Sequence, residues 1–251
     1  MQSVLVTIRN QRLQLQQDRY ESLVDLKRGC VSLMTSYTPV GDPIAETNLS
    51  EVCLAYNTMK GINGYLSPDE KNLFNSWVRN LCQKTIDDYN TLTPGMVNLK
   101  NNFQSHRIKI LACGALSLRD TNLMAVASKW LEAHLEENLL QGGLCLDFTL
   151  RDSCTYTVYS LEPICVAIHS IFRLTGVNYF TYKNKLGVNL PSAVRWLLPY
   201  IQGVKTNVMF INSIYDSDKA KTDYGKIWNK SNCVNLVNLC IPFDASFIDF
   251  F

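Results

Sequence analysis

Apolar side chains recur every three or four residues along most of this chain, which is the period of an amphipathic α-helix. The pattern predicts a long first helix over residues 4–34, with no internal proline and no glycine before Gly29. Further helices are predicted where the same period returns, over residues 50–59, 102–118, 152–174, 191–201, 219–228 and 234–239. Only residues 207–211 have an extended pattern, and no second segment is an evident partner for them. The chain is therefore predicted to be all-α.

Helix starts and stops are marked most clearly in the middle of the chain. Ser67-Pro68-Asp69-Glu70 combines an N-cap serine, a proline at the first helical position and a glutamate that completes a capping box. The helix after it has one apolar face, formed by Leu73, Phe74, Trp77, Val78 and Leu81. Asp120 or Thr121 is predicted to cap a later helix, which Gly142-Gly143 ends.

Short polar turns between consecutive helices predict antiparallel helical hairpins. Repeated hairpins curve into a solenoid or a toroid, and no segment of this chain repeats at a fixed period. We therefore expect a single domain over residues 1–251 with the fold of an α/α toroid. With 251 residues and 47% apolar side chains, the chain is long enough to bury a sizeable core.

The charge balance narrows the choice of partners. The 24 basic and 22 acidic residues give a net charge of +2, which provides no long-range field for nucleic acid or an anionic membrane. No apolar run reaches the roughly 18 residues of a membrane span, so no membrane insertion is expected. Charged residues follow the N-terminus before any apolar core of a signal peptide forms. The expected location is cytoplasmic, or outside the cell after export without a cleaved N-terminal signal peptide.

The nine cysteines are scattered along the chain, and no pair has CxxC spacing. Most lie in apolar helical stretches, where a free cysteine behaves as a small hydrophobic residue. We expect reduced thiols in the core, which favours a reducing compartment. No Cys and His residues have the spacing of zinc ligands, so neither a metal site nor another cofactor is expected.

Polar side chains gather at two predicted helix starts. In the first, residues 99–107, Asn102 and His106 are four residues apart and share one helix face. On spacing alone a structural interpretation is favoured, in which Asn101 caps the helix and His106 is a hydrogen-bonded core residue. The other two histidines, His134 and His169, have no polar cluster nearby and are expected to be structural.

The second start, residues 147–163, places Arg151, Tyr156 and Tyr159 within about two helical turns. Arg151 is the only cation in this segment, so a carboxylate clamp built here must use its guanidinium. Here too, spacing alone favours a structural interpretation, an amphipathic helix with two half-buried tyrosines and a solvated arginine.

Together the two segments resemble motifs of the alginate lyase family, the helical-toroid polysaccharide lyases. The segment Asn101-Asn102-Phe103-Gln104-Ser105-His106-Arg107 is similar to the family's Asn-Asn-His helix start. Arg151-Asp152 followed by Tyr156-Thr157-Val158-Tyr159 and Leu161-Glu162-Pro163 is similar to its Arg…Tyr-His-x-Tyr-x-Leu segment. Val204-Lys205-Thr206-Asn207 with Phe210-Ile211-Asn212-Ser213 resembles a third, weaker motif. The resemblance spans residues 49–216, and the order and spacing of the first two motifs make it fairly specific. Compared with the family, the chain is short at its N-terminus, so the resemblance implies an incomplete α/α toroid that lacks the first helical hairpins.

The resemblance implies β-elimination on a uronic-acid polysaccharide, with no metal and no cofactor. In that reaction the substrate carboxylate is neutralised, the proton at C5 is removed and the leaving glycosidic oxygen is protonated. The resemblance assigns the carboxylate to Asn102 and Arg151, the base to His106 and the acid to Tyr159. The residues expected to bind the acidic polysaccharide are Asn101, Arg107, Tyr156, Lys205 and Asn207.

The sequence departs from the family pattern at positions that matter for the chemistry. Phe103 stands where the family has its histidine, and His106 lies about one helical turn further on. Thr157 replaces the histidine of the Tyr-His-x-Tyr segment, which leaves open whether Tyr156 or Tyr159 acts as the acid. These losses motivate an alternative function, a catalytically degenerate relative that binds a glycan or a protein, including as a secreted effector.

Overall fold

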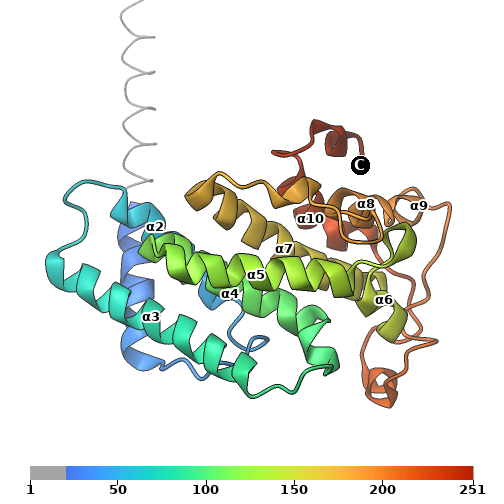
Figure 1. Ribbon diagram of the computed structural model, residues 1–251, viewed down its shortest axis with the longest axis horizontal. Coiled ribbons are helices and arrows are strands. Elements are labelled where there is room, and N and C mark those ends of the chain that lie inside the picture. The colour runs from blue at the N-terminus through green and yellow to red at the C-terminus, as the bar shows by residue number, and fades with distance from the viewer. Residues whose placement is uncertain (1–20, 251) are drawn as a thin grey trace, which may run out of the picture.

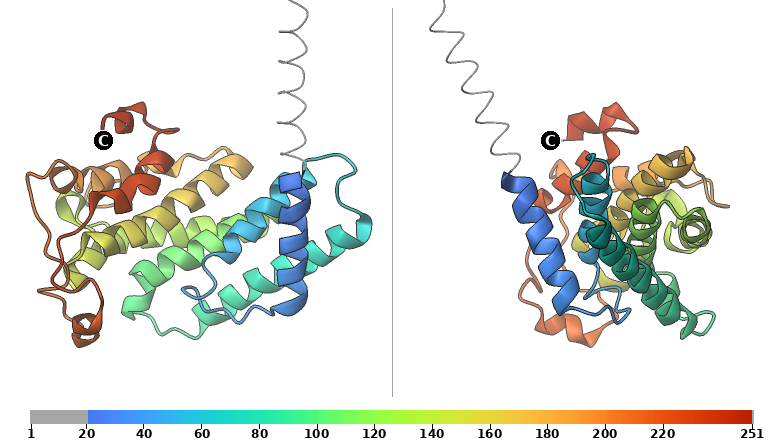
Figure 2. Two further views of the ribbon diagram at one scale, coloured as in Figure 1. Left: turned by 180° about the vertical axis from the view of Figure 1, so that it is seen from behind. Right: turned by 90° about the vertical axis from the view of Figure 1, so that its left-hand side faces the viewer.

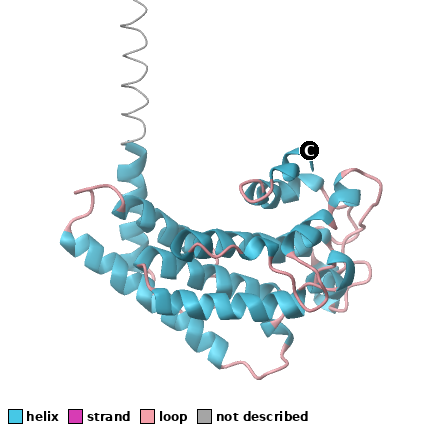
Figure 3. Cartoon of the chain, turned by 45° about the horizontal axis from the view of Figure 1, so that its top comes forward, coloured by secondary structure: helices cyan, strands magenta, loops and turns pink. Residues whose placement is uncertain are grey.

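The computed structural model describes residues 21–250, which fold into helices joined by turns and loops (Figure 1, Figure 3). Residues 21–36 are helical, as predicted, and residues 4–20 of the predicted first helix lie outside the described residues. The α-helices after it are α2 (Leu49–Lys60), α3 (Pro68–Asn90), α4 (Asn102–Leu118), α5 (Thr121–Asn138), α6 (Leu146–Arg151), α7 (Cys154–Thr175), α8 (Leu190–Arg195), α9 (Leu198–Ile201) and α10 (Val234–Cys240). Short 3₁₀-helices are η1 (Val97–Leu99), η2 (Gln141–Gly143), η3 (Tyr179–Thr181), η4 (Asp216–Ala220), η5 (Lys230–Cys233) and η6 (Ala245–Phe250). No strand forms within residues 21–250, and the all-α prediction is confirmed.

Helix α4 runs through the middle of the molecule and packs against α2, α3, α5 and α7 (Figure 1, Figure 2). Almost all of its residues are buried, including charged ones. Its approach to α3 depends on Gly114, because a Cβ at that position would lie 2.3 Å from the Cys82 Sγ. A short turn at Arg119 and Asp120 joins α4 to α5, so these two helices form an antiparallel hairpin.

The predicted helix starts are confirmed by their hydrogen bonds. Ser67 Oγ accepts from the Glu70 N–H (3.2 Å), and Glu70 Oε2 accepts from the Ser67 N–H (2.8 Å), which completes the capping box of α3. Of the two residues proposed to cap α5, Asp120 does so. Its Oδ1 accepts from the N–H groups of Asn122 and Leu123, both at 3.1 Å.

The C-terminal third is less regular than predicted. The helix predicted over residues 191–201 is two short helices, α8 and α9. The prediction of a helix over residues 219–228 is wrong. Most of that segment forms turns, and its end pairs with residues 207–209. Gly225 has φ +70°, and the Met209 N–H donates to the Lys226 carbonyl (2.9 Å). Val208 and Ile227 form a single antiparallel bridge, so residues 207–211 are partly paired rather than a strand.

All nine cysteines are free and buried, as expected for reduced core residues. Burial raises the pKa of the Cys82 thiol to about 12 and that of the Cys113 thiol to about 11. Within residues 21–250, no helix is long and apolar enough to cross a membrane.

The capping box gives a direct test of how α3 is held. Ser67→Ala removes the acceptor for the Glu70 N–H, and we expect the free energy of unfolding to fall by about 1 kcal/mol. Urea denaturation measures the difference. Ser76→Ala, at an exposed position inside the same helix, is the matched control and should change stability little. Equal effects of the two substitutions would contradict a capping role.

Candidate active site

The starts of α4 and α7 lie side by side, as they must if the two polar segments form one site (Figure 1). Asp147, buried in α6 just before α7, accepts hydrogen bonds from the Asn102 N–H (3.0 Å) and the Asn138 side chain (2.9 Å). Burial raises the pKa of the Asp147 carboxyl, although these hydrogen bonds favour its charged form. Further along the pair, Ser105 Oγ in α4 lies 3.1 Å from Ser160 Oγ in α7. These polar contacts fix α4 against the segment that carries α6 and α7.

A cleft of about 320 Å³ opens between α2, α4 and α7, and Asn232 of η5 also lines it. His106 and Tyr159 both face this cleft, and the centroids of their rings lie 4.4 Å apart. The residue proposed as base and the residue proposed as acid are therefore adjacent. The other polar lining residues are Thr47, Asn48, Glu51, Lys109, Thr155 and Glu162.

The two ring nitrogens of His106 have different surroundings. Nδ1 lies 2.7 Å from the Thr47 hydroxyl. Nε2 is shielded from solvent and has no hydrogen-bond partner among the described residues. Burial, with a smaller contribution from the Lys109 ammonium, lowers the pKa of His106 to about 3. The imidazole is therefore neutral at physiological pH, with one nitrogen uncommitted.

Tyr159 is half-buried and forms no hydrogen bond with the described residues. Burial, followed by smaller contributions from Tyr156 and Asp42, raises the pKa of its phenol. The hydroxyl therefore keeps its proton at neutral pH and can donate it. The centroid of the Tyr156 ring is 6.1 Å from that of Tyr159, but Tyr156 does not line the cleft. This placement favours Tyr159 over Tyr156 as the acid.

Lys109, Glu51 and Glu162 also line the cleft, although the sequence assigned a site role to none of them. A signal for Lys109 was present in the sequence, because it lies three residues after His106, on the same face of α4. It is also a charged residue between two isoleucines, in a helix that is otherwise apolar at this point. Glu51 and Glu162 come from α2 and α7, and only the packing of those helices shows that they share the cleft.

Arg151 lies outside this cleft and is committed to an ion pair. Its guanidinium donates to Asp218, whose side chain is fully buried. It also lies over the rings of Tyr156 and Tyr215, at 4.5 and 4.3 Å from their centroids. Ser213 Oγ donates to the other Asp218 oxygen at 2.5 Å. Arg151 therefore fastens the loop over residues 203–233 to the end of α6.

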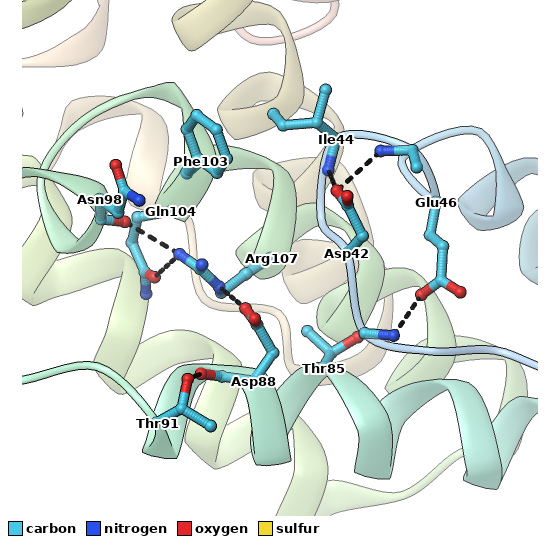
Figure 4. Close-up of polar contacts among 12 residues, drawn as sticks. Asp42, Ile44, Glu46, Thr85, Asp88, Thr91, Asn98, Phe103, Gln104 and Arg107 are labelled. Atoms are coloured by element: carbon cyan, nitrogen blue, oxygen red, sulfur yellow. Dashed lines mark hydrogen bonds and ion pairs between the residues drawn. The ribbon is translucent and has the colours of Figure 1, made fainter.

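Arg107 faces away from the cleft into the contact between α3 and α4, where Figure 4 shows its partners. Its Nε donates to Asp88 at 2.6 Å, and its Nη1 donates to the Asn98 carbonyl at 2.9 Å and to the Gln104 side chain at 3.4 Å. Only 2% of the side chain is exposed. An arginine with these partners acts as a structural bridge in the described structure.

The remaining predicted site residues are spread over several positions. Asn101 caps α4, accepting from the Phe103 N–H (3.1 Å), which matches the structural interpretation of this segment. Asn102 is buried at the first position of α4 and does not line the cleft. Asn207 Oδ1 accepts from the Cys154 N–H (2.9 Å) at the start of α7. Asn207 and Lys205 line a separate hollow of about 480 Å³.

The sequence and the fold were both compared with those of known proteins. The family model described as alginate lyase matches residues 40–207. The fold is similar to that of a crystal structure of an alginate lyase from Bacteroides ovatus, with a TM-score of 0.56, 18% sequence identity and 82% of this chain covered. The match covers 52% of that chain, so this chain spans about half the length of the solved structure. No curated protein matches.

An all-α architecture similar to that structure is an α/α toroid, the fold expected from the sequence. Because the family model covers more than half of the chain, the chain belongs to the alginate lyase family, whose members are polysaccharide lyases.

The Arg151–Asp218 pair allows a structural role to be separated from a catalytic one. We expect Arg151→Gln to lower the free energy of unfolding by about 2 kcal/mol, because it removes the closer of the two cations beside the buried Asp218 carboxylate and leaves only Lys221, at 4.0 Å. This expected loss is smaller than for a fully buried ion pair, because 20% of the arginine side chain is exposed to solvent. Urea denaturation of the single and double variants measures the coupling.

The double variant Arg151→Gln with Asp218→Asn is the matched control. It removes both charges, so we expect it to recover most of the lost stability. A single variant as stable as the unsubstituted chain, or a double variant no more stable than Arg151→Gln, would contradict the structural role.

Proposed function

We propose that this protein cleaves a uronic-acid-containing polysaccharide by β-elimination, with His106 and Tyr159 as the proton-transfer pair. The observation that carries the proposal is the contact between the imidazole and the phenol at the wall of one cleft. Membership in the alginate lyase family supports the same reaction class. Two groups that transfer protons in opposite directions have to reach the same sugar linkage, and these two do so from adjacent helices.

The proposed step balances without water or an oxidant. His106 Nε2 takes the proton from C5 of the uronate, and the electron pair of that C–H bond forms the double bond between C4 and C5. The bond from C4 to the glycosidic oxygen breaks, and the Tyr159 hydroxyl gives its proton to that oxygen. The products are one chain with a new reducing end and one that begins with an unsaturated uronate. Transfer of the proton from His106 to Tyr159 restores both groups.

The protonation states in the free protein suit these roles. His106 is neutral above a pH of about 3, so it can accept a proton, and Tyr159 holds its proton at neutral pH. A bound uronate carboxylate beside the imidazole raises the pKa of His106, because an adjacent negative charge favours the imidazolium. Since Nε2 is shielded from solvent in the described structure, side chains around the imidazole have to move when the sugar enters.

A second candidate is a relative that binds a glycan without cleaving it. Two observations favour it. His106 Nε2 is closed off from solvent, and Arg151 is committed to Asp218 outside the cleft. Tight glycan binding with no unsaturated product would support this candidate over the lyase.

Replacing Tyr159 tests the proposed acid. We expect Tyr159→Phe to lower kcat by about 10²- to 10⁴-fold, because the leaving oxygen then departs without its proton. The measurement is the rise in ultraviolet absorbance of the unsaturated uronate, on a panel of polyuronates and glycosaminoglycans. Tyr182→Phe, a tyrosine that bonds to Glu136 on α5, is the matched control and should keep the rate. No absorbance rise with the unsubstituted protein on any polymer of the panel would contradict the lyase proposal.

The burial of His106 predicts an unusual titration. With a pKa of about 3, the imidazole should stay neutral from pH 8 down to pH 5, where an exposed histidine takes up a proton near pH 6.5. Imidazole nitrogen chemical shifts in NMR spectra measure this, and the signals are assigned by their loss in His106→Gln. A midpoint near 6.5 would show instead that the ring is open to water in solution.

A further inference from the structure

Lys109 is a buried cation without a partner at the wall of the cleft. The residue is 8% exposed, and its side chain forms no hydrogen bond and no ion pair within 4 Å among the described residues. It lines the same cleft as His106 and Tyr159. The ammonium nitrogen is not among the buried side-chain atoms that lack a partner, so it is open to solvent at the cleft although the rest of the residue is covered. An ammonium held at the end of a buried side chain is placed to meet an anion that enters the cleft.

The surroundings of Lys109 define the charge of that group. Burial lowers the pKa of its ammonium, while Glu51 of α2, Glu162 of α7 and the neighbouring Cys113 favour the charged form from a distance. His106, one turn before it on α4, is neutral. A ligand carboxylate placed at the cleft wall would supply the missing negative charge and offset the cost of burial.

Glu51 and Glu162 limit how many carboxylates the cleft accepts. Lys109 is the one cation among the described residues that line it, beside these two acidic residues. Burial raises the pKa of the Glu162 carboxyl, Lys109 partly offsets this, and the nearby Glu51 carboxylate raises it further, so the two acidic groups repel each other. A second carboxylate close to them would meet the same repulsion.

The cleft continues along α7 as a groove that is also lined by acidic and polar side chains. Two adjoining hollows share Glu51 and Val166 with the cleft, and they run between α2 and α10. Asn235 and Asn238 line the continuation, and their amides both donate and accept hydrogen bonds as sugar hydroxyls require. The next cation is Arg173, about 16 Å beyond Glu162 along the helix. The groove therefore offers separated cations joined by acidic and amide groups.

We propose that Lys109 binds the carboxylate of the reacting uronate, and that the substrate is a polymer in which uronates alternate with uncharged sugars. This inference rests on the proposed function, and it assigns to Lys109 the neutralising role that the family resemblance gave to Asn102 and Arg151. In a polymer where every sugar is a uronate, the neighbours of the bound sugar bring further carboxylates toward Glu51 and Glu162. In an alternating polymer, hydroxyl and amide groups occupy those places.

The experiment compares two kinds of polymer on one protein. Hyaluronan and unsulfated chondroitin alternate a uronate with an uncharged amino sugar, and alginate and polygalacturonate carry a carboxylate on every sugar. We expect kcat/KM on the alternating polymers to be at least about tenfold higher. Glu51→Gln with Glu162→Gln should narrow that ratio, because it removes the repulsion and keeps the shape of the side chains.

Substitutions of Lys109 test its role separately. Lys109→Met keeps the length of the side chain, so the fold should be retained, and thermal unfolding checks this. We expect it to lower kcat/KM by about 10²- to 10³-fold, the loss typical of one charge-stabilising group. Lys109→Arg should keep most of the activity and move the alkaline limb of the pH–rate profile upward, because a guanidinium stays protonated. A merely structural lysine would not move that limb.

The outcomes separate this inference from the proposed function. Faster turnover of alginate or polygalacturonate would overturn the alternating substrate and leave the lyase in place. Equal activity of Lys109→Met and the unsubstituted protein would overturn the carboxylate role. If no polymer is cleaved but hyaluronan binding measured by calorimetry is lost in Lys109→Met, the lyase proposal fails and the role of Lys109 is supported. Absence of both cleavage and binding would overturn both.

Discussion

Helix α4 carries polar and charged side chains through a layer that four other helices cover, so each of these side chains has to be paired, neutralised or directed to the cleft. Arg107 is paired with Asp88 in the contact with α3, and Ser105 bonds to Ser160 in the contact with α7. His106 is neutral, and Lys109 reaches the cleft. The site is thus a consequence of the same packing that stabilises the fold, because an unpaired polar group inside the layer costs free energy.

Local signals in the sequence were sufficient for the helices that have strong start and stop residues. The capping box at Ser67 and the cap at Asp120 are determined by side chains within four residues of each other, which a sequence shows directly. The segment over residues 219–228 has a helical spacing of apolar side chains, but its backbone pairs with Asn207 and Met209 instead. Such pairing between distant segments has no local signature, so the periodicity was misleading there.

In the candidate site, too, contacts between residues far apart in the chain could not be predicted from the sequence. The resemblance located His106 and Tyr159, whose contact depends only on the two helix starts lying side by side. It could not show that Arg151 is used by Asp218, because the two residues are far apart in the chain. It also passed over Lys109, since a lysine on a predicted helix is usually solvated, and only the covering helices make this one exceptional. Residue types therefore suggested the chemistry, whereas burial and pairing decided which residues are available for it.

The close-packed thiols give the folded chain a chemical protection that its opened forms lack. Nine cysteines lie in the interior with no disulfide between them, and burial keeps those such as Cys82 and Cys113 protonated and out of reach of electrophiles. Each opening of the helical layers releases thiols that are ready to be alkylated or wrongly cross-linked. The rate at which a thiol reagent modifies each cysteine of the native protein therefore reports how often the helices around that cysteine separate.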